Sequence, residues 1–131
     1  MSSINELVKK AHDNAVEHGW WEEDRGFGEQ IALIHSELSE ALEEYRDGRG
    51  TKDVYYECKH PGSFMDGPPE CKSGCMICKR GKPCGIPIEL ADTVIRIFDT
   101  CGRYGINLEQ AIIEKMKYNQ GRKYRHGGKI L

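Results

Sequence analysis

Hydrophobic residues recur with the period of an α-helix in four stretches of the chain, and polar residues fill the positions between them. The clearest stretch is 27–47, in which five apolar residues gather on one face at about 100° per residue: Ile31, Ile34, Leu38, Leu42 and Tyr45. The other stretches are 3–18, 87–104 and 107–122. No convincing strand pattern and no internal repeat interrupts them. The pattern predicts an all-α protein, a bundle of four helices packed on their apolar faces.

The ends of these stretches carry helix start and stop signals. Ser3 and Asn107 each begin a capping box, with Glu6 and Gln110 three residues later. Glycines follow three of the stretches where a helix is expected to end: Gly19, Gly48 and Gly105. The last stretch is expected to bury one apolar side, which consists of Ala111, Ile112 and Met116.

An irregular insertion, at about 51–85, separates the second and third helical stretches. It has no helical period, and it contains five of the six cysteines: Cys58, Cys71, Cys75, Cys78 and Cys84. A loop of this length needs something to order it, and clustered cysteines without a secretory signal favour metal over disulfides. We therefore expect structural Zn²⁺ here. The five thiols exceed the four ligand positions of tetrahedral zinc, so the ligand set stays open. The alternative is a flexible insertion with reduced, uncoordinated thiols.

Size and charge restrict the classes of protein further. A chain of 131 residues is most simply one domain, 1–131. The net charge of −2 gives no electrostatic reason to expect a nucleic acid or a membrane as partner. No signal peptide and no apolar run of membrane-spanning length is visible. A cytoplasmic protein is expected, in which the isolated Cys101 packs as a small core residue.

Acidic side chains form two pairs, each with a spacing of three residues. Glu37 and Glu40 lie in the 27–47 stretch, and Glu89 and Asp92 lie in the 87–104 stretch. Residues three apart are neighbours on a helix, and the first pair falls on the flank of its apolar stripe. Two carboxylate pairs from two helices suit Mg²⁺, which binds a few carboxylates together with waters and substrate phosphates. One glutamate, Glu37 or Glu40, is then positioned to act as the base toward water.

Two further groups suggest a phosphorylated ligand with an aromatic base. Lys115, Asn119 and Arg122 share one face of the last stretch, and such a stripe suits phosphate oxygens. Trp20 and Trp21 follow the first stretch and offer rings on which a nucleobase could stack. Each group also has a simpler interpretation: the stripe as a solvated helix face, and the tryptophans as caps of the bundle core. No P-loop sequence is present, which disfavours ordinary kinase or motor ATPase chemistry.

Three of these motifs together resemble the MazG-like all-α nucleoside triphosphate pyrophosphatases. The matching segments are 33–41, 89–96 and the Lys115-x₃-Asn119-x₂-Arg122 pattern. The resemblance implies a helical bundle, a homodimer or homotetramer, and Mg²⁺-dependent release of pyrophosphate from (deoxy)nucleoside triphosphates. It further implies that Glu37, Glu40, Glu89 and Asp92 bind Mg²⁺ and that the third motif binds phosphates. The family joins its two acidic pairs by a shorter connection, and the cysteine-rich insertion accounts for the excess.

Two rival functions remain. One is a phosphoribosyl-ATP pyrophosphohydrolase, which performs similar chemistry on a biosynthetic nucleotide. The other is a non-catalytic, zinc-stabilised interaction module in which the helices serve as scaffold.

Overall fold

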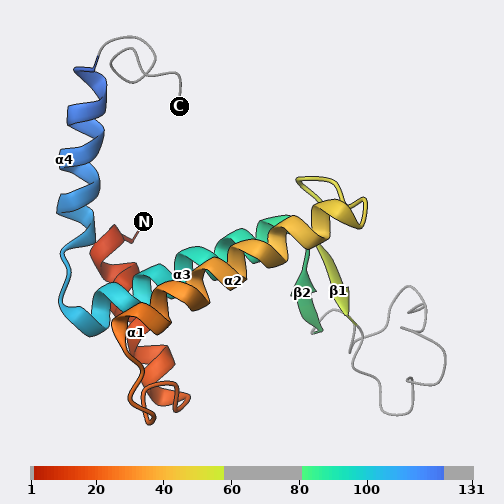
Figure 1. Cartoon of the computed structure of the whole chain (residues 1–131), viewed down its shortest axis with the longest axis horizontal. Helices are drawn as coiled ribbons and strands as arrows, with labels where there is room; N and C mark the ends of the chain where they lie inside the picture. The colour runs from red at the N-terminus through yellow and green to blue at the C-terminus, as the bar shows by residue number, and fades with distance from the viewer. Residues whose placement is uncertain (1, 58–80, 123–131) are drawn as a thin grey trace. The chain divides into compact units, whose positions relative to one another are not determined.

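The computed structural model describes residues 2–57 and 81–122 (Figure 1). The described part of the chain contains four helices: α1 (Ile4–Glu17), α2 (Phe27–Arg46), α3 (Ile86–Tyr104) and α4 (Leu108–Gln120). All four predicted helices are confirmed, with ends within a few residues of those expected. No helix in these two ranges is long and apolar enough to cross a membrane.

The expected local signals stop and start these helices. The Ser3 hydroxyl accepts a hydrogen bond from the Glu6 amide, and the Asn107 side chain accepts one from the Gln110 amide. Glycines with positive φ follow three helices, as expected from their freedom to adopt this backbone conformation: Gly19 (φ 81°), Gly48 (φ 88°) and Gly105 (φ 65°).

The structure also contains a small sheet that the periodicity did not predict. Strands β1 (Tyr55–Glu57) and β2 (Lys82–Cys84) pair antiparallel, with Tyr55 opposite Cys84 and Glu57 opposite Lys82. The expectation of no strands was therefore wrong. Three residues are too few to display an alternating pattern, and the pairing joins segments that are far apart in sequence. The two strands form a ribbon at the two ends of the cysteine-rich insertion. Residues 58–80, between the strands, lie outside the described residues.

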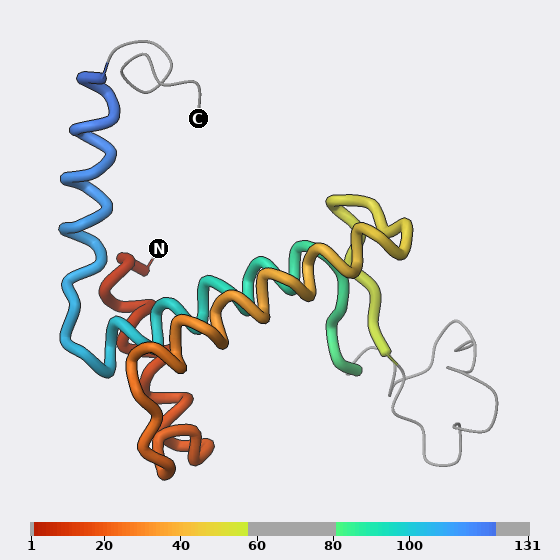
Figure 2. The backbone as a smooth tube through the Cα atoms, in the orientation of Figure 1, coloured from red at the N-terminus to blue at the C-terminus, as the bar shows by residue number. Residues whose placement is uncertain are grey.

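The chain forms two compact units, each described here by itself. The first contains residues 1–26 and 95–131, and the second contains residues 27–94. Helix α3 contributes its first half to the second unit and its second half to the first. The backbone trace shows α3 as one continuous helix (Figure 2).

In the first unit, the N-termini of α1 and α4 cap each other. Glu109 Oε1 accepts a hydrogen bond from the Ile4 amide at 3.0 Å, and Asn5 Oδ1 accepts one from the Glu109 amide at 3.3 Å. Both helix ends thereby satisfy backbone donors that have no partner within their own helix. Asn5 Nδ2 also donates to Asn107 Oδ1, the capping residue of α4, at 3.0 Å.

The core of the first unit is small and contains a polar cluster. Val8 and Cys101 are buried, which confirms the core position expected for Cys101, and burial raises the pKa of its thiol. Beside them the buried Asp99 carboxylate lies 2.8 Å from His12 Nδ1 and accepts a hydrogen bond from Trp21 Nε1 at 2.8 Å. A buried carboxylate with two partners of this kind fixes the approach of α1 to α3.

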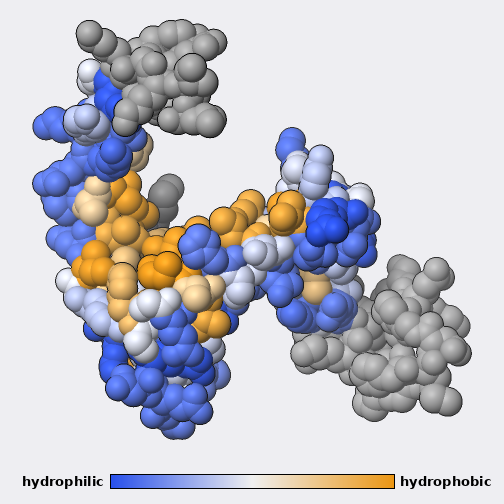
Figure 3. Space-filling view, in the orientation of Figure 1, coloured by the Kyte–Doolittle hydropathy of each residue, from blue (hydrophilic) through white to orange (hydrophobic). Residues whose placement is uncertain are grey.

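In the second unit, the apolar stripe of α2 is largely exposed. Ala41 is buried, yet four members of the stripe expose between 39% and 64% of their surface: Ile31, Leu38, Leu42 and Tyr45. Leu90 and Val94 of α3 are exposed to a similar degree. Figure 3 shows hydrophobic atoms along this stretch of helix. Within the described residues of the second unit, the stripe is therefore not covered, and its packing in a four-helix bundle stays a prediction.

The apolar side of α4 is likewise not covered. Ala111 and Met116 are exposed, the latter by 60%, and Ile112 is half-buried. Within the described residues of the first unit this side is therefore exposed, and its burial in a bundle stays a prediction. The period correctly predicted a helix, but an apolar face is buried only where another element is available to pack on it.

Candidate metal and phosphate site

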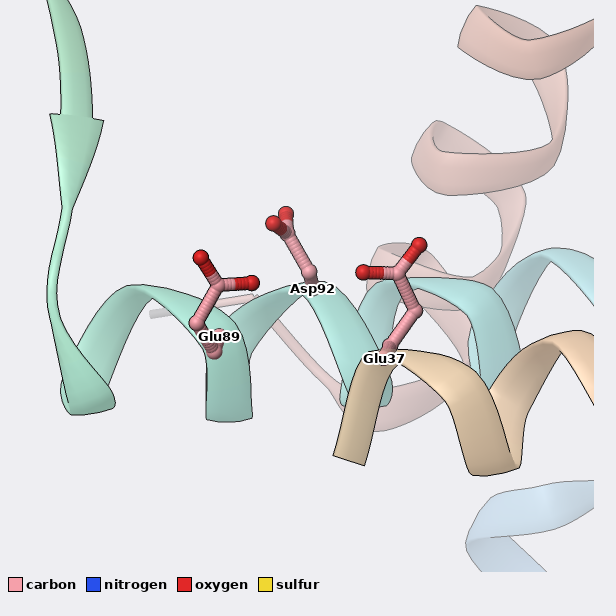
Figure 4. A group of neighbouring side chains, drawn as sticks. All are labelled: Glu37, Glu89 and Asp92. Carbon is pink, nitrogen blue, oxygen red and sulfur yellow. The ribbon is translucent and has the colours of Figure 1, made fainter. Parts of the chain in front are cut away.

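Three carboxylates from two helices meet in the second unit. Glu37 of α2 and Glu89 and Asp92 of α3 each offer an oxygen, and these oxygens lie within 4.8 Å of one another (Figure 4). All three residues are half-buried. The spacing of three places Glu89 and Asp92 on one side of α3, and the lateral contact between the two helices brings Glu37 to the same side.

The electrostatics of this cluster are those of crowded acids. Burial raises the pKa of Glu89, and the negative charges of Asp92, Glu40 and Glu37 raise it further. The charge of Lys82 acts in the opposite direction. Carboxylates that share a site resist simultaneous ionisation unless a cation compensates them.

The donor set fits a hard divalent cation. Oxygens bound to Mg²⁺ at 2.0–2.1 Å are about 2.9 Å apart when adjacent and about 4.2 Å apart when opposite. The three oxygens, within 4.8 Å of one another, lie at separations of the order that one such cation spans. Among the described residues, the cluster consists of carboxylates alone, and oxygen ligands of this kind match the preference of Mg²⁺.

Glu40 has a different position from the three clustered acids. It is exposed and does not belong to the group of oxygens within 4.8 Å, although its charge acts on Glu89. The sequence assigned all four acids to the metal, and the structure brings three of them together. Glu44, one turn further along α2, accepts a hydrogen bond from the Tyr55 hydroxyl at 2.8 Å instead.

The predicted phosphate stripe lies on and just after α4, in the first unit. Lys115 Nζ lies 4.9 Å from the centroid of the Tyr118 ring, and the Arg122 guanidinium lies 5.7 Å from it. The two cations therefore lie near the same aromatic ring, and their alignment with Asn119 as a phosphate-binding stripe stays a prediction. The acids belong to the second unit, so the combination of both sets in one site stays a prediction.

The two tryptophans are half-buried in the first unit, among guanidinium groups. The guanidinium carbons of Arg25 and Arg96 lie 4.3 and 4.4 Å from the centroid of the Trp20 ring. The indole N–H of Trp21 donates a hydrogen bond to Asp99, and the guanidinium carbon of Arg103 lies 4.9 Å from the centroid of the Trp21 ring. Packing and a role in base stacking are compatible for such rings, and the stacking role stays a prediction.

Of the candidate zinc ligands, Cys84 belongs to the described residues. Its side chain is 4% exposed, and Sγ lies 3.4 Å from the carbonyl oxygen of Lys82. Burial raises the pKa of the thiol, and the charge of Glu57 adds to this effect. Zinc binds the thiolate form of cysteine, and Cys84 stays one of the five candidate ligands. The other four lie outside the described residues: Cys58, Cys71, Cys75 and Cys78.

Two residues of the second unit were not anticipated from the sequence. Lys82 acts electrostatically on the acid cluster from the end of the cysteine-rich insertion. Gln30 is only 2% exposed, and its Nε2 has no hydrogen-bond partner. Gln30 precedes Glu37 by seven residues, which places it two turns away on the same side of α2. The spacing of seven residues could have shown from the sequence that Gln30 lies on the same side of α2 as Glu37. Nothing in the sequence linked Lys82 to the acids.

The crowded acids lead to a prediction about metal and pH. Because the folded-state pKa of Glu89 is raised above its ordinary value of 4.5, the folded protein holds this proton more tightly than the unfolded chain. The stabilising contribution is therefore complete below that value and is lost as the pH rises through the raised pKa. At pH 7.5 the ionised cluster destabilises the metal-free fold, and we expect Mg²⁺ to reverse this.

Thermal unfolding with and without Mg²⁺ measures this effect. At a Mg²⁺ concentration about tenfold above Kd, mass action adds about 1.4 kcal/mol, which is about 4–8 °C in Tm. We expect this gain at pH 7.5 and a smaller one at pH 5, where protons compete for the cluster. NaCl of equal ionic strength is the control. An equal shift with NaCl would mean that general screening, and not a specific site, causes the stabilisation.

Comparison with known proteins provides no relative. The chain matches no family model, no curated protein and no solved structure.

Proposed function

We propose that this protein is a Mg²⁺-dependent nucleotide pyrophosphohydrolase, which converts (deoxy)nucleoside triphosphates to the monophosphate and pyrophosphate. The observation that carries the proposal is the convergence of Glu37, Glu89 and Asp92 from two helices. These residues come from the two acidic motifs that resemble the MazG-like pyrophosphatases. We also propose that the protein acts in the cytoplasm, as expected from the sequence.

The acids divide into two roles in this proposal. Glu37, Glu89 and Asp92 hold Mg²⁺, which when bound neutralises charge on phosphate oxygens and acidifies water. Glu40 is exposed beside them and is free of the cluster of ligand oxygens. It therefore accepts the proton that water loses as its oxygen adds to phosphorus and the α–β phosphoanhydride bond breaks. Glu37 is the other candidate for this base, and its place among the clustered oxygens favours a metal ligand.

The remaining predicted residues bind the nucleotide. Lys115, Asn119 and Arg122 hold the departing phosphates, and the neighbouring cations of this face suit a polyanion. Trp20 or Trp21 stacks on the base. Guanidinium groups already lie over both rings, and planar cations of this kind also stack on nucleobases.

We also propose that the protein is a homodimer or homotetramer. The exposed stripe of α2, with Leu38, Leu42 and Tyr45, continues onto Leu90 and Val94 of α3. Apolar patches above a few hundred Å² on soluble proteins mark interaction surfaces. A second copy presents the same two-helix face, so that an isologous contact forms a four-helix layer from two chains. Such a contact places the partner next to the acids on the flank of the stripe.

Structural zinc in the cysteine-rich insertion remains part of the proposal. Tetrahedral zinc has four ligand positions, and five cysteines are candidates for them: Cys58, Cys71, Cys75, Cys78 and Cys84.

The direct test is pyrophosphate release from a panel of NTPs, dNTPs and phosphoribosyl-ATP, measured with Mg²⁺ and again with EDTA. We expect release that requires Mg²⁺, with the nucleoside monophosphate as the other product. Activity confined to phosphoribosyl-ATP would support the proposed reaction but would show that the substrate is a biosynthetic nucleotide and not a nucleoside triphosphate. No release from any member of the panel would contradict the proposal and favour the non-catalytic, zinc-stabilised interaction module.

A further inference from the structure

The two strands that begin and end the cysteine-rich insertion form a ribbon that is fixed to the helices of the second unit. At its base, Gly85 has φ 116°, and a Cβ at this position would collide with the carbonyl oxygen of Asp53. Only glycine fits this conformation and this close approach of two backbone segments. The Gly85 carbonyl oxygen also accepts hydrogen bonds from the Ile88 and Glu89 amides, each at 3.0 Å. The end of β2 is thereby tied directly to the first turn of α3.

A second attachment joins the ribbon to α2. The Tyr55 hydroxyl donates to Glu44 Oε1 at 2.8 Å, and this bond raises the pKa of Tyr55 to about 12. The Arg49 guanidinium lies 3.9 Å from the Tyr55 ring centroid, and its Nε lies 3.9 Å from Glu44 Oε2. A tyrosine with this pKa remains a hydrogen-bond donor throughout the neutral range. The ribbon therefore holds a fixed position against both helices that carry the acids.

One face of the ribbon is turned toward those helices. Side chains alternate between the two faces of a strand, so Tyr55 and Glu57 share a face with their partners Cys84 and Lys82. Tyr55 reaches Glu44 of α2 from this face, and Cys84 is buried on it. The opposite face, with Tyr56 and Pro83, is exposed. Lys82 therefore extends from the helix-facing side, one alternate position beyond the buried Cys84.

In Figure 4, strand β2 approaches α3 from one side of the helix, and the carboxylates of the acid cluster point toward that side. Lys82 is the first residue of that strand, and its positive charge acts on Glu89. The side chain is nevertheless exposed, and no ion pair of Lys82 occurs in residues 2–57 and 81–122. The charge of Lys82 therefore acts on Glu89, but within the described residues Lys82 does not neutralise the acids through a direct ion pair.

We propose that Lys82 binds the polyphosphate of the substrate at the edge of the acid cluster, so that the end of the cysteine-rich insertion belongs to the substrate site. This inference rests on the proposed function, and it assigns a cation of the second unit itself to the phosphates. A metal held by the acids leaves a charged phosphate group at the outer edge of the site. A lysine there provides a mobile point charge and three donors for its oxygens. Lys82 is a binding residue for the phosphates, whereas the acids hold the metal.

The test compares Lys82→Gln with Lys52→Gln. Lys52 is an exposed lysine of the segment that leads into β1, and its charge does not act on Glu89. Both variants remove one positive charge, so they separate a local effect from a change in net charge. Three quantities are measured for each protein: Mn²⁺ affinity of the metal-free form, affinity for inorganic pyrophosphate with Mg²⁺ present, and KM and kcat for the best nucleotide of the panel.

We expect Lys82→Gln to weaken pyrophosphate binding and to raise KM, each by roughly tenfold, with a smaller change in kcat. Mn²⁺ affinity is expected to stay the same or to increase up to about threefold, because a positive charge near the acids has been removed. Lys52→Gln is expected to resemble the wild type in all three measurements. A phosphate-binding role predicts these opposite effects on anion and cation, which a purely structural role of Lys82 would not produce.

Two results would overturn the inference: pyrophosphate affinity within twofold of the wild type in Lys82→Gln, or an equal loss in Lys52→Gln. Failure of the proposed function has a different signature, namely a wild-type protein that hydrolyses no nucleotide. The pyrophosphate measurement needs no turnover, so it tests Lys82 in either case.

Discussion

Glu37→Gln and Glu89→Gln are each expected to lose Mg²⁺-dependent pyrophosphate release by roughly a thousandfold or more. Each replacement removes one of the three clustered carboxylates and substitutes a neutral, weaker ligand. Metal-dependent charge stabilisation and activation of water then disappear together. Calorimetric titration with Mn²⁺ should show a parallel loss of metal affinity. The folds should persist, because Gln removes a charge from a crowded acidic cluster and leaves the side-chain volume nearly unchanged.

Glu40→Gln separates the two proposed roles of the acids. We expect it to abolish turnover while metal affinity stays within a few-fold of the wild type, because Glu40 lies outside the clustered oxygens. Glu43→Gln is the matched control, since Glu43 is an exposed acid of the same helix that pairs with Arg46 at 3.1 Å. Circular dichroism and Tm verify that each variant is folded. Retention of activity by Glu40→Gln would remove its assignment as base, and retention by Glu37→Gln and Glu89→Gln would remove the metal site.

Leu42→Glu is expected to dissociate the homo-oligomer. Leu42 exposes 56% of its surface within one chain, so the substitution costs the isolated subunit little. At an interface, the same change removes about 2 kcal/mol of apolar burial and buries a charge at a cost of several kcal/mol. An isologous contact carries the change twice. We therefore expect Kd to increase by roughly a thousandfold or more, which corresponds to about 4 kcal/mol.

Sedimentation or light scattering at micromolar concentration measures this change. The wild type should have a mass of two or four times 14.9 kDa, and Leu42→Glu should have the mass of one chain. Ser36→Glu adds the same charge to an exposed polar position of α2 and should keep the wild-type mass. An unchanged mass in Leu42→Glu would show that another surface joins the subunits, and a monomeric wild type would contradict the oligomer itself.

The local sequence was sufficient for most of the helical structure. Each helix has a repeating apolar period, and glycines or capping residues near its ends act within a few residues of the chain. Ser3 and Asn107 accept the hydrogen bonds that the capping-box pattern predicts. Such interactions are nearly independent of the rest of the fold. The same patterns did not specify burial: Leu42 and Met116 lie on apolar faces, and each is exposed within the described residues of its own unit.

The acid cluster was predictable because its geometry is mostly that of a single helix. A spacing of three places Glu89 and Asp92 together whatever surrounds them, and Glu37 joins them because α2 lies beside the first half of α3. The fourth acid, Glu40, shares the motif of Glu37 but does not share its place in the cluster. Its separation depends on the rotation of α2 against α3, which sequence spacing does not specify.

The sequence by itself determined the helices, their caps and the acids that two of them present, because these follow from interactions within a few residues. Only the tertiary structure decided that β1 and β2 pair and that Cys84 is buried beside Tyr55. Those features depend on contacts between residues that are 25 or more positions apart. No local pattern encodes such a contact, because its energy is realised only when the intervening chain brings both partners together.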